Sequence, residues 1–207
     1  MADSRNRRFW NRVAQRYAAR PLKNPAAYEA MLTDAASRLS PQHRVLEIGC
    51  GTGGTAIRLA QGVAAYVATD FSEEMIRIAE AKAAGDNLRF VVADADTALA
   101  DGSYDAICAF NVLHLVDDLP GTLARLHDGL APGGLLISKT WCFGDLNIGM
   151  RSLFAVLRLI GLFPAAHMLT EPRLRQALAE AGFTITDQRQ FGTYAQNPYL
   201  VAHKPAA

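Results

Sequence analysis

This chain of 207 residues has little of what marks several classes of protein. It holds only three cysteines, Cys50, Cys108 and Cys142, without CxxC or Cys/His spacing, which argues against a disulfide framework and a zinc site. No uninterrupted apolar run reaches the roughly 20 residues of a membrane-spanning helix. No apolar segment of the kind found in secretory signals follows the charged start of the chain. We therefore expect a protein of the cytoplasm with no metal site.

An excess of charge of one sign is also missing. The 21 Lys and Arg residues stand against 20 Asp and Glu residues, which gives a formal net charge of +1. Because a basic excess is what holds a phosphate backbone, we expect no nucleic-acid partner. The hydrophobic fraction of 50% and the mean hydropathy of +0.05 are ordinary for a globular protein. The length predicts a single domain over residues 1–207 and leaves the oligomeric state open.

Short apolar runs alternate with longer helix-like segments from Arg44 onward. This pattern is typical of parallel strands joined by crossover helices, and it predicts an α/β fold with a doubly wound sheet. Two further strands that follow the last helix are expected to form an antiparallel pair at one edge. The expected strands are 44–49, 66–69, 88–93, 104–110, 135–139, 183–190 and 199–202, and the expected helices run through 57–60 for about ten residues and over 72–84, 119–130 and 171–181.

Two segments stand outside this alternation. Residues 5–40 are predicted to be helical, with Phe9, Val13 and Tyr17 on one face, and the first 25 residues hold seven basic residues against one acidic residue. The second segment, 148–169, is apolar but carries Arg158 and is broken at Pro164. It predicts a buried or interfacial helix rather than a membrane span.

The sharpest local pattern is a glycine-rich turn after the first expected strand. Gly49, Gly51 and Gly54 satisfy GxGxxG, and free N–H groups at a helix start attract anionic or electron-rich groups. Asp70, which ends the next strand, can accept hydrogen bonds from both hydroxyls of a ribose. Together they predict a nucleoside site. One alternative is a turn made for strand–helix packing, with Asp70 capping a helix. A second is a nicotinamide dinucleotide site, although the chain has no YxxxK pair and no second nucleotide motif.

Five segments resemble, in order, the motifs of class I S-adenosylmethionine-dependent methyltransferases. They are Val45–Gly53, Thr69–Met75, Ala93–Asp96, Tyr104–His114 and Leu130–Leu135, and the resemblance covers 44–140 closely. It implies a Rossmann-like seven-stranded mixed sheet with the last strand antiparallel. It also implies S-adenosyl-L-methionine as cofactor and S-adenosyl-L-homocysteine as product. The domain would divide into an N-terminal helical cap (1–43), a cofactor-binding core (44–140), an acceptor-side insertion (141–170) and a C-terminal helix and strand pair (171–207).

The resemblance also implies residue roles at the cofactor. Glu47 and the turn from Gly49 to Gly53 would border the methionine part, and Asp70 would hold the ribose. For Cys50, a small residue in a crowded turn and a thiol of lowered pKa are the two interpretations. Phe71 and Met75 would lie beside the adenine, Asp94 and Ala95 at its amine, and Asn111 and Val112 near the sulfonium. The full implied cofactor-binding set is Glu47, Gly49, Cys50, Gly51, Thr52, Gly53, Asp70, Phe71, Met75, Asp94, Ala95, Asn111 and Val112.

The acceptor side is less defined. His114 is the candidate catalytic residue, a general base that also lines the acceptor pocket, and the alternative is a residue that lines the pocket without moving a proton. Trp10 and Tyr17 are either lid residues that touch the acceptor or core-packing residues, and Trp141 opens the insertion on the acceptor side. We expect a small hydrophobic or aromatic acceptor. Two alternatives are a phospholipid N-methyltransferase that docks on anionic membrane through the basic helix, and a non-catalytic cofactor-binding regulator.

Overall fold

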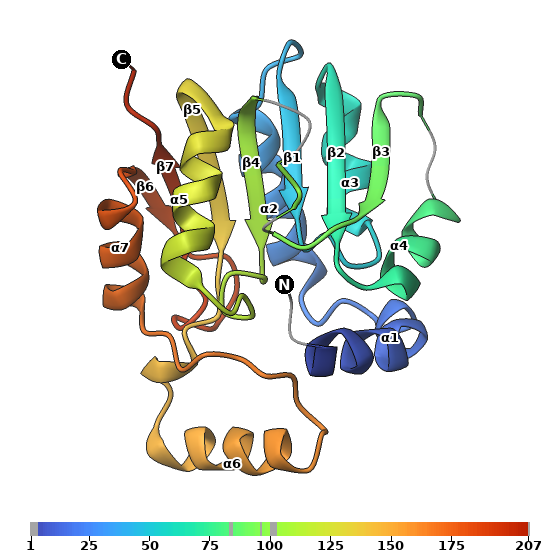
Figure 1. Ribbon diagram of the computed structural model, residues 1–207, viewed down its shortest axis with the longest axis vertical. Helices are drawn as coiled ribbons and strands as arrows, with labels where there is room; N and C mark the ends of the chain where they lie inside the picture. Colours follow the sequence, from blue (N-terminus) through green and yellow to red (C-terminus); the bar gives the residue numbers. More distant parts are fainter. Residues whose placement is uncertain (1–3, 83–84, 96, 100–102, 207) are drawn as a thin grey trace.

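One mixed sheet of seven strands forms the centre of the molecule in the computed structural model, which describes residues 4–82, 85–95, 97–99 and 103–206 (Figure 1). The strand order is β3-β2-β1-β4-β5-β7-β6, which confirms the expected Rossmann-like α/β fold. The strands are β1 (Arg44–Ile48), β2 (Ala65–Asp70), β3 (Leu88–Val92), β4 (Tyr104–Phe110), β5 (Leu130–Lys139), β6 (Thr184–Arg189) and β7 (Tyr199–His203).

The strand directions agree with the sequence. Strands β1 to β5 pair in parallel, whereas β7 pairs antiparallel with both β5 and β6. The last strand is therefore inserted antiparallel beside β5, and β6 closes the edge, as predicted. The fifth strand begins earlier than expected, at Leu130, because an irregularity in its pairing with β4 takes up the turn at Pro132–Gly134.

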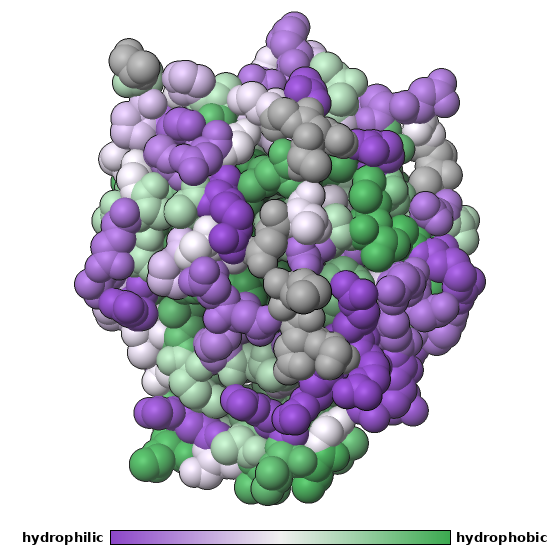
Figure 2. Space-filling view, viewed as in Figure 1, coloured by the Kyte–Doolittle hydropathy of each residue, from purple (hydrophilic) through white to green (hydrophobic). Residues whose placement is uncertain are grey.

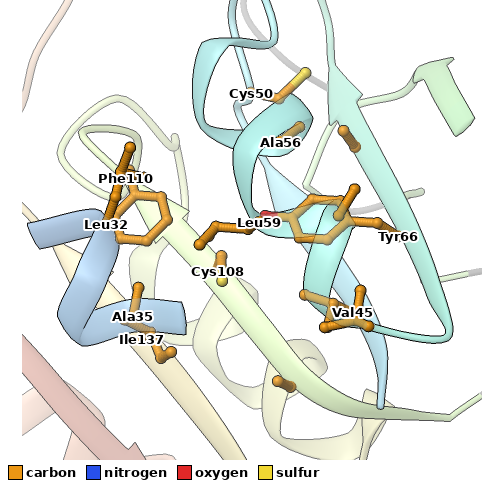
Figure 3. Packing of buried hydrophobic residues seen from close by; sticks show 14 of the residues in the cluster. Leu32, Ala35, Val45, Cys50, Ala56, Leu59, Tyr66, Cys108, Phe110 and Ile137 are labelled. Carbon is orange, nitrogen blue, oxygen red and sulfur yellow. The ribbon is translucent and has the colours of Figure 1, made fainter. Parts of the chain in front are cut away.

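Helices cover both faces of the sheet. On one face lie α2 (Pro25–Ser37), α3 (Gly54–Leu59) and α4 (Glu73–Glu80), and on the other lie α5 (Leu119–Gly129) and α7 (Glu171–Glu180). Each face has its own hydrophobic cluster. Figure 3 shows part of the first cluster, in which Leu32 of α2 and Leu59 of α3 face side chains of the strands, among them Val45, Tyr66 and Cys108. The two layers bury both faces of the strands, as a parallel sheet requires.

Some helix boundaries differ from the prediction. The expected stretch 5–40 is two helices, α1 (Ser4–Ala18) and α2, because the Asn24 side chain accepts from the Ala27 amide at 3.0 Å and Pro25 opens α2. The helix after the glycine turn is shorter than expected, since a 3₁₀ turn over Ala60–Gly62 follows α3. The Ser72 side chain caps α4 by accepting from the Met75 amide at 3.2 Å, while the expected helix end at 83–84 lies outside the described residues.

The insertion 141–170 extends beyond one end of the sheet. It contains a 3₁₀ turn, η2 (Phe143–Asp145), and helix α6 (Ile148–Leu159), which lies at the lower end of the view in Figure 1. None of the residues of α6 is buried, so of the two expected alternatives, a buried and an interfacial helix, the buried one is wrong. Within the described part of the chain, no helix combines the length and the apolar character needed to cross a membrane.

Candidate functional site

The carboxyl ends of β1, β2 and β4 meet at one edge of the sheet, and the glycine turn leaves β1 there. Ile48 pairs with Thr69 across β1 and β2, and Glu47 pairs with Cys108 across β1 and β4. In open parallel sheets, ligands bind outside the carboxyl ends of the strands. The register therefore places the turn, the end of β2 and the end of β4 around one location.

Three glycines give the turn its shape. Gly49, Gly51 and Gly53 have φ values of +65°, +54° and +76°, which favour glycine. A Cβ on Gly49 would lie 2.4 Å from Cγ2 of Val112, and one on Gly53 would lie 2.7 Å from Cζ of Phe90. These two positions serve strand–helix and loop packing, as the packing alternative proposed.

Gly51 is different from its two neighbours. The nearest atom to a Cβ there would be Cε1 of Tyr17, at 3.9 Å, so the space above this part of the turn is open. The turn therefore has a closed side against the protein and an open side under α1. Thr52 lies half-buried in the same turn.

The Asp70 carboxylate holds the turn to the start of α4. Its Oδ2 accepts from the Gly51 amide and its Oδ1 from the Ser72 amide, both at 2.9 Å. Burial, with only 8% of the residue exposed, raises the pKa of Asp70 to about 6, while the two amide bonds oppose the rise. Asp70 thus binds the amide of the residue that precedes α4, whereas the helix itself is capped by the Ser72 side chain and not by Asp70. Each carboxylate oxygen accepts more than one hydrogen bond, so this contact is compatible with a ligand.

Glu47 is the second buried carboxyl group of the site. It is 2% exposed and accepts from the Tyr66 hydroxyl at 2.9 Å. Burial, followed by the nearby charge of Asp70, raises the pKa of Glu47 to about 8. At neutral pH this group is mostly protonated, and a cation beside it would favour its ionised form.

The remaining implied cofactor residues lie around this pair in different environments. Cys50 is buried and its pKa is raised, first by desolvation and then by Glu47 and Asp70, which favours the small-residue interpretation over a reactive thiol. Phe71 is half-buried, whereas Met75 is only 2% exposed and lies inside the first turn of α4.

The end of β3 completes this side of the site. The Ala93 amide donates to the Asp70 carbonyl at 3.0 Å, which brings Asp94 near the end of β2. An Asp94 oxygen accepts from the amide and the hydroxyl of Thr97, at 3.0 and 2.8 Å. Ala95 packs against the second hydrophobic cluster. Asp96, part of the same motif, lies outside the described residues.

Helix α1 lies over the β2–α4 turn. Asn11 Nδ2 donates to Glu73 at 2.7 Å, and its Oδ1 accepts from the Ser72 hydroxyl at 2.5 Å. Trp10 and Tyr17 meet edge to face at 5.9 Å between ring centroids, and the Trp10 indole N–H is buried without a partner. The pKa of Tyr17 is raised by burial and then by Asp70. Both aromatic residues therefore lie on the cofactor side of the site.

The end of β4 carries a strained residue. Asn111 has a φ of +57°, the single non-glycine residue with positive φ in the described chain. Its amide donates to the Lys139 carbonyl at 2.6 Å, and its side-chain oxygen accepts from Asn197 at 3.3 Å. Such backbone strain persists only where neighbouring contacts impose it, and it is concentrated at functional sites.

A cluster of aromatic rings lies on the far side of Asn111. Phe143 is at its centre and meets His114 at 5.3 Å and Trp141 at 5.8 Å between ring centroids. The cluster also includes Phe154, Phe163 and Tyr194. His114 is 5% exposed, and burial, together with the nearby His167, lowers its pKa to about 3. Its Nδ1 is buried without a partner.

The cap and the insertion meet each other. The Asn6 side chain donates to the Ala165 carbonyl at 3.2 Å and accepts from the Ala165 amide at 2.9 Å. Arg12 donates to the Gly161 carbonyl at 2.8 Å. The two segments thus form one connected structure across the site, whereas among the described residues no ring contact joins Trp10 or Tyr17 to Trp141.

Sequence reasoning missed Asn6, Asn11 and Phe143. Asn6 lies four residues before Trp10 on the apolar side of α1. A polar residue on an apolar helix face indicates a buried hydrogen bond, and this signal could have identified Asn6. Phe143 gave no signal by spacing, because its ring partners come from distant segments. Within the described ranges, no group of His, Cys, Asp and Glu residues is arranged to hold a metal ion.

Comparison with known proteins adds a family and a fold. The profile of the methyltransferase domain family matches residues 3–188. An uncharacterized methyltransferase of Mycobacterium tuberculosis is 35% identical over 124 residues, 59% of this chain and 62% of the relative, so the chain spans less than two thirds of that relative. A malonyl-[acyl-carrier protein] O-methyltransferase of Bacillus cytotoxicus is 33% identical over 100 residues, 47% of this chain and 35% of that protein.

Solved structures share the whole fold. Magnesium protoporphyrin IX methyltransferase from Synechocystis, crystallised with bound S-adenosylhomocysteine, superposes with a TM-score of 0.72. The alignment covers 96% of this chain and 97% of that one at 24% identity. At this identity the likeness establishes the sheet and its helices, and the chemistry has to be argued from the residues described above.

Proposed function

This chain belongs to the methyltransferase domain family, and we propose from this premise that it transfers a methyl group from S-adenosylmethionine to a small apolar acceptor. The observation that carries the proposal is the position of Asp70. Its buried carboxylate joins the Gly51 amide to the Ser72 amide below an open turn. A ribose placed on that turn would meet the carboxylate directly.

The residues present fit this cofactor. The space above Gly51, the Asp70 carboxylate and the Tyr17 ring surround one location, and Trp10 packs against Tyr17. When bound, the cofactor supplies a methyl group on a positively charged sulfur.

In our proposal the protein's residues hold and shield the cofactor. Asp70 binds the ribose, and Phe71, Met75, Asp94 and Ala95 bind the adenine. Glu47 and the turn Gly49–Gly53 bind the methionine part, and Asn111 and Val112 border the sulfur.

Two buried carboxyl groups explain why a cationic cofactor suits this place. Glu47 and Asp70 both have raised pKa values because burial penalises their ionised forms. A sulfonium and an ammonium group nearby would stabilise those forms and lower both pKa values. Binding is therefore expected to release protons near neutral pH, chiefly from Glu47.

The acceptor side is apolar, and His114 is a weak base there. His114 has a pKa of about 3, far below the value near 10 of a phenol, so it is poorly matched to take a proton from one. The prediction that His114 is the general base stays untested, and we assign it instead a positioning role beside Phe143. The acceptor would then arrive with a free lone pair, as a carboxylate, a thiolate or an unprotonated amine.

A carboxylate is the acceptor we favour among these. A malonyl group, named for the Bacillus cytotoxicus relative, ends in a carboxylate, and that relative is named for O-methylation. In our proposal Trp141 and the aromatic residues around Phe143 contact the apolar body of the acceptor, while Trp10 and Tyr17 reach it as lid residues from the cofactor side. None of the relatives described above is named for a phospholipid or as a regulator, and both alternatives stay predictions.

Incubation with radiolabelled S-adenosylmethionine and a cell extract tests the proposal. The products are separated into lipid, small-molecule, protein and nucleic-acid fractions, and we expect label in the small-molecule fraction. Label confined to protein or nucleic acid would contradict the acceptor class. Cofactor binding by calorimetry without transfer to any fraction would favour the regulator.

The role of His114 is tested by His114→Gln with the acceptor so found. A positioning residue that only donates or accepts a hydrogen bond predicts a fall in kcat of less than about 10-fold and no histidine inflection in the pH–rate profile. Loss of a general base predicts about 100- to 10,000-fold. His43→Gln, just before β1 at the opposite end of the sheet, is the matched control.

A further inference from the structure

Helix α6 presents an apolar face that none of the described residues covers. Ile148 is 82% exposed, Val156 55%, Leu159 86% and Ile160 59%, and Leu162, just beyond the helix, is 66% exposed. Ile148, Val156 and Leu159 fall on one side of α6 at 100° per residue, and Ile160 is the C-cap that follows the helix. Figure 2 shows this hydrophobic area at the lower end of the molecule, below a hydrophilic band. Contiguous exposed apolar surface of this kind marks an interaction site.

The opposite side of α6 attaches it to the protein. Phe154 meets Phe143 at 5.3 Å and Phe163 at 4.6 Å between ring centroids. These contacts hold the helix by its inner side and leave the outer side directed to the surroundings. The same ring cluster continues through Phe143 to His114, so the inner side of α6 adjoins the acceptor side of the site, and the outer face lies on the other side of the helix.

Positive charge borders the apolar face on one flank and at one end. Arg151 and Arg158 lie seven residues apart on one flank of α6, and residues 146–170 contain no Asp or Glu. On α1, four exposed arginines share one face by their spacing: Arg5, Arg8, Arg12 and Arg16. Because Arg12 donates to the Gly161 carbonyl just beyond α6, this arginine stripe runs beside the end of α6.

We propose that the outer face of α6, with the flanking arginines, docks on an anionic lipid bilayer. An apolar helix face bordered by basic residues lies in the plane of a membrane interface, with its aliphatic side chains in the acyl boundary and its arginines at the phosphates. Each basic residue near an anionic bilayer adds attraction that salt screens. The inference rests on the proposed function in one respect, since it names the membrane as the source of the apolar acceptor.

Charge argues against a second copy of the chain as the occupant. A symmetric contact through α6 would bring two arginine stripes together without acidic partners in residues 146–170. An acidic protein would satisfy the arginines, but the aliphatic side chains at the centre of the surface match lipid without needing a shaped partner. The bilayer is therefore the occupant that uses both features.

Vesicle sedimentation tests the docking without cofactor or acceptor. Wild-type protein should bind mixed vesicles made of equal parts phosphatidylcholine and phosphatidylglycerol, and this binding should weaken at high salt. It should bind only weakly to vesicles of phosphatidylcholine alone. The triple variant Ile148→Ser, Val156→Ser, Leu159→Ser should lower the partition coefficient about 100-fold, since three aliphatic side chains leave the acyl boundary. Val92→Ser, 45% exposed on β3, should leave it unchanged. Arg151→Gln with Arg158→Gln should weaken binding to the anionic vesicles only, with Arg173→Gln on α7 as control.

Three outcomes would overturn the proposal. They are failure of the wild type to bind the anionic vesicles at low salt, equal loss of binding in Val92→Ser, and a dimer that the triple variant converts to monomer while vesicles stay unbound. Calorimetry with S-adenosylmethionine separates this result from the proposed function. A protein that binds vesicles but no cofactor would refute the function and leave the docking intact, and the reverse result would refute the docking alone.

Discussion

The two sides of the site are built by different means. On the cofactor side, the Asp70 carboxylate joins two amides, and a turn of positive φ leaves open space at Gly51. On the acceptor side, ring contacts around Phe143 and an exposed helix, α6, replace such backbone geometry. The comparison indicates that one side depends on main-chain geometry and buried charge. The other depends on apolar surface, which tolerates change in individual residues.

The two sides also respond to pH in opposite directions. For Asp70 and Glu47 the folded-state pKa is raised, from 3.8 to about 6 and from 4.5 to about 8. The folded state therefore holds more protons in those windows, and stability falls as pH rises through them. For His114 the pKa is lowered from 6.5 to about 3, so stability falls as pH drops below 6.5. Cofactor binding would relieve the first effect and not the second.

The largest expected effect comes from Gly49→Ala. Its Cβ would lie 2.4 Å from Val112 Cγ2 at a φ of +65°. We expect a loss of about 3 kcal/mol in the free energy of unfolding from left-handed strain and overpacking, and cofactor binding weakened more than about 100-fold. Denaturant unfolding measures the loss of stability, and calorimetry measures the loss of cofactor affinity. Gly133→Ala, at a φ of +76° with no atom within 4 Å, isolates the conformational part and should leave cofactor affinity unchanged. Equal effects of both variants would refute this account of the turn.

Asp70→Asn separates stability from binding. The affinity for S-adenosylmethionine should fall by roughly 1–3 kcal/mol, because the ribose loses a charged acceptor. Without cofactor at pH 8, the variant should have a larger free energy of unfolding, because it removes a buried charge. The gain is at most about 3 kcal/mol, and the weaker hydrogen bonds from the Gly51 and Ser72 amides reduce it. Its unfolding free energy should also lose the slope between pH 4 and 6 that Asp70 causes. Asp118→Asn, at the exposed N-cap of α5, is the control. An unchanged affinity would contradict the ribose assignment.

The predictable part of the molecule is the part whose sequence pattern is local. The glycine turn Gly49–Gly53 and the strand alternation each act within a few residues, so the strands of the sheet and the turn after β1 were predicted. The break between α1 and α2 was not predicted, although Asn24 and Pro25 are local signals of a helix start. The residue roles at the cofactor rest on resemblance and stay predictions.

The acceptor side could not be predicted to the same degree. Whether α6 is buried depends on what covers it, and its apolar residues fit a core helix as well as an exposed one. The contact of Asn6 with Ala165 spans 159 residues of sequence, and no spacing rule reaches so far. The pKa of His114 depends on burial by such distant segments, which is why a base was a reasonable prediction from the sequence.

The smallest expected effects come from a matched pair on α1. Asn6 is 3% exposed and bonds both backbone groups of Ala165 on the insertion, whereas Asn11 bonds Ser72 and Glu73 on the cofactor side. Removing either set costs about 1–2 kcal/mol. Asn6→Ala should therefore raise the KM of the acceptor about 5-fold at unchanged cofactor affinity, and Asn11→Ala should do the reverse. If both variants changed both constants alike, α1 would act as one rigid cover, and the division of the site into two independently held sides would be wrong.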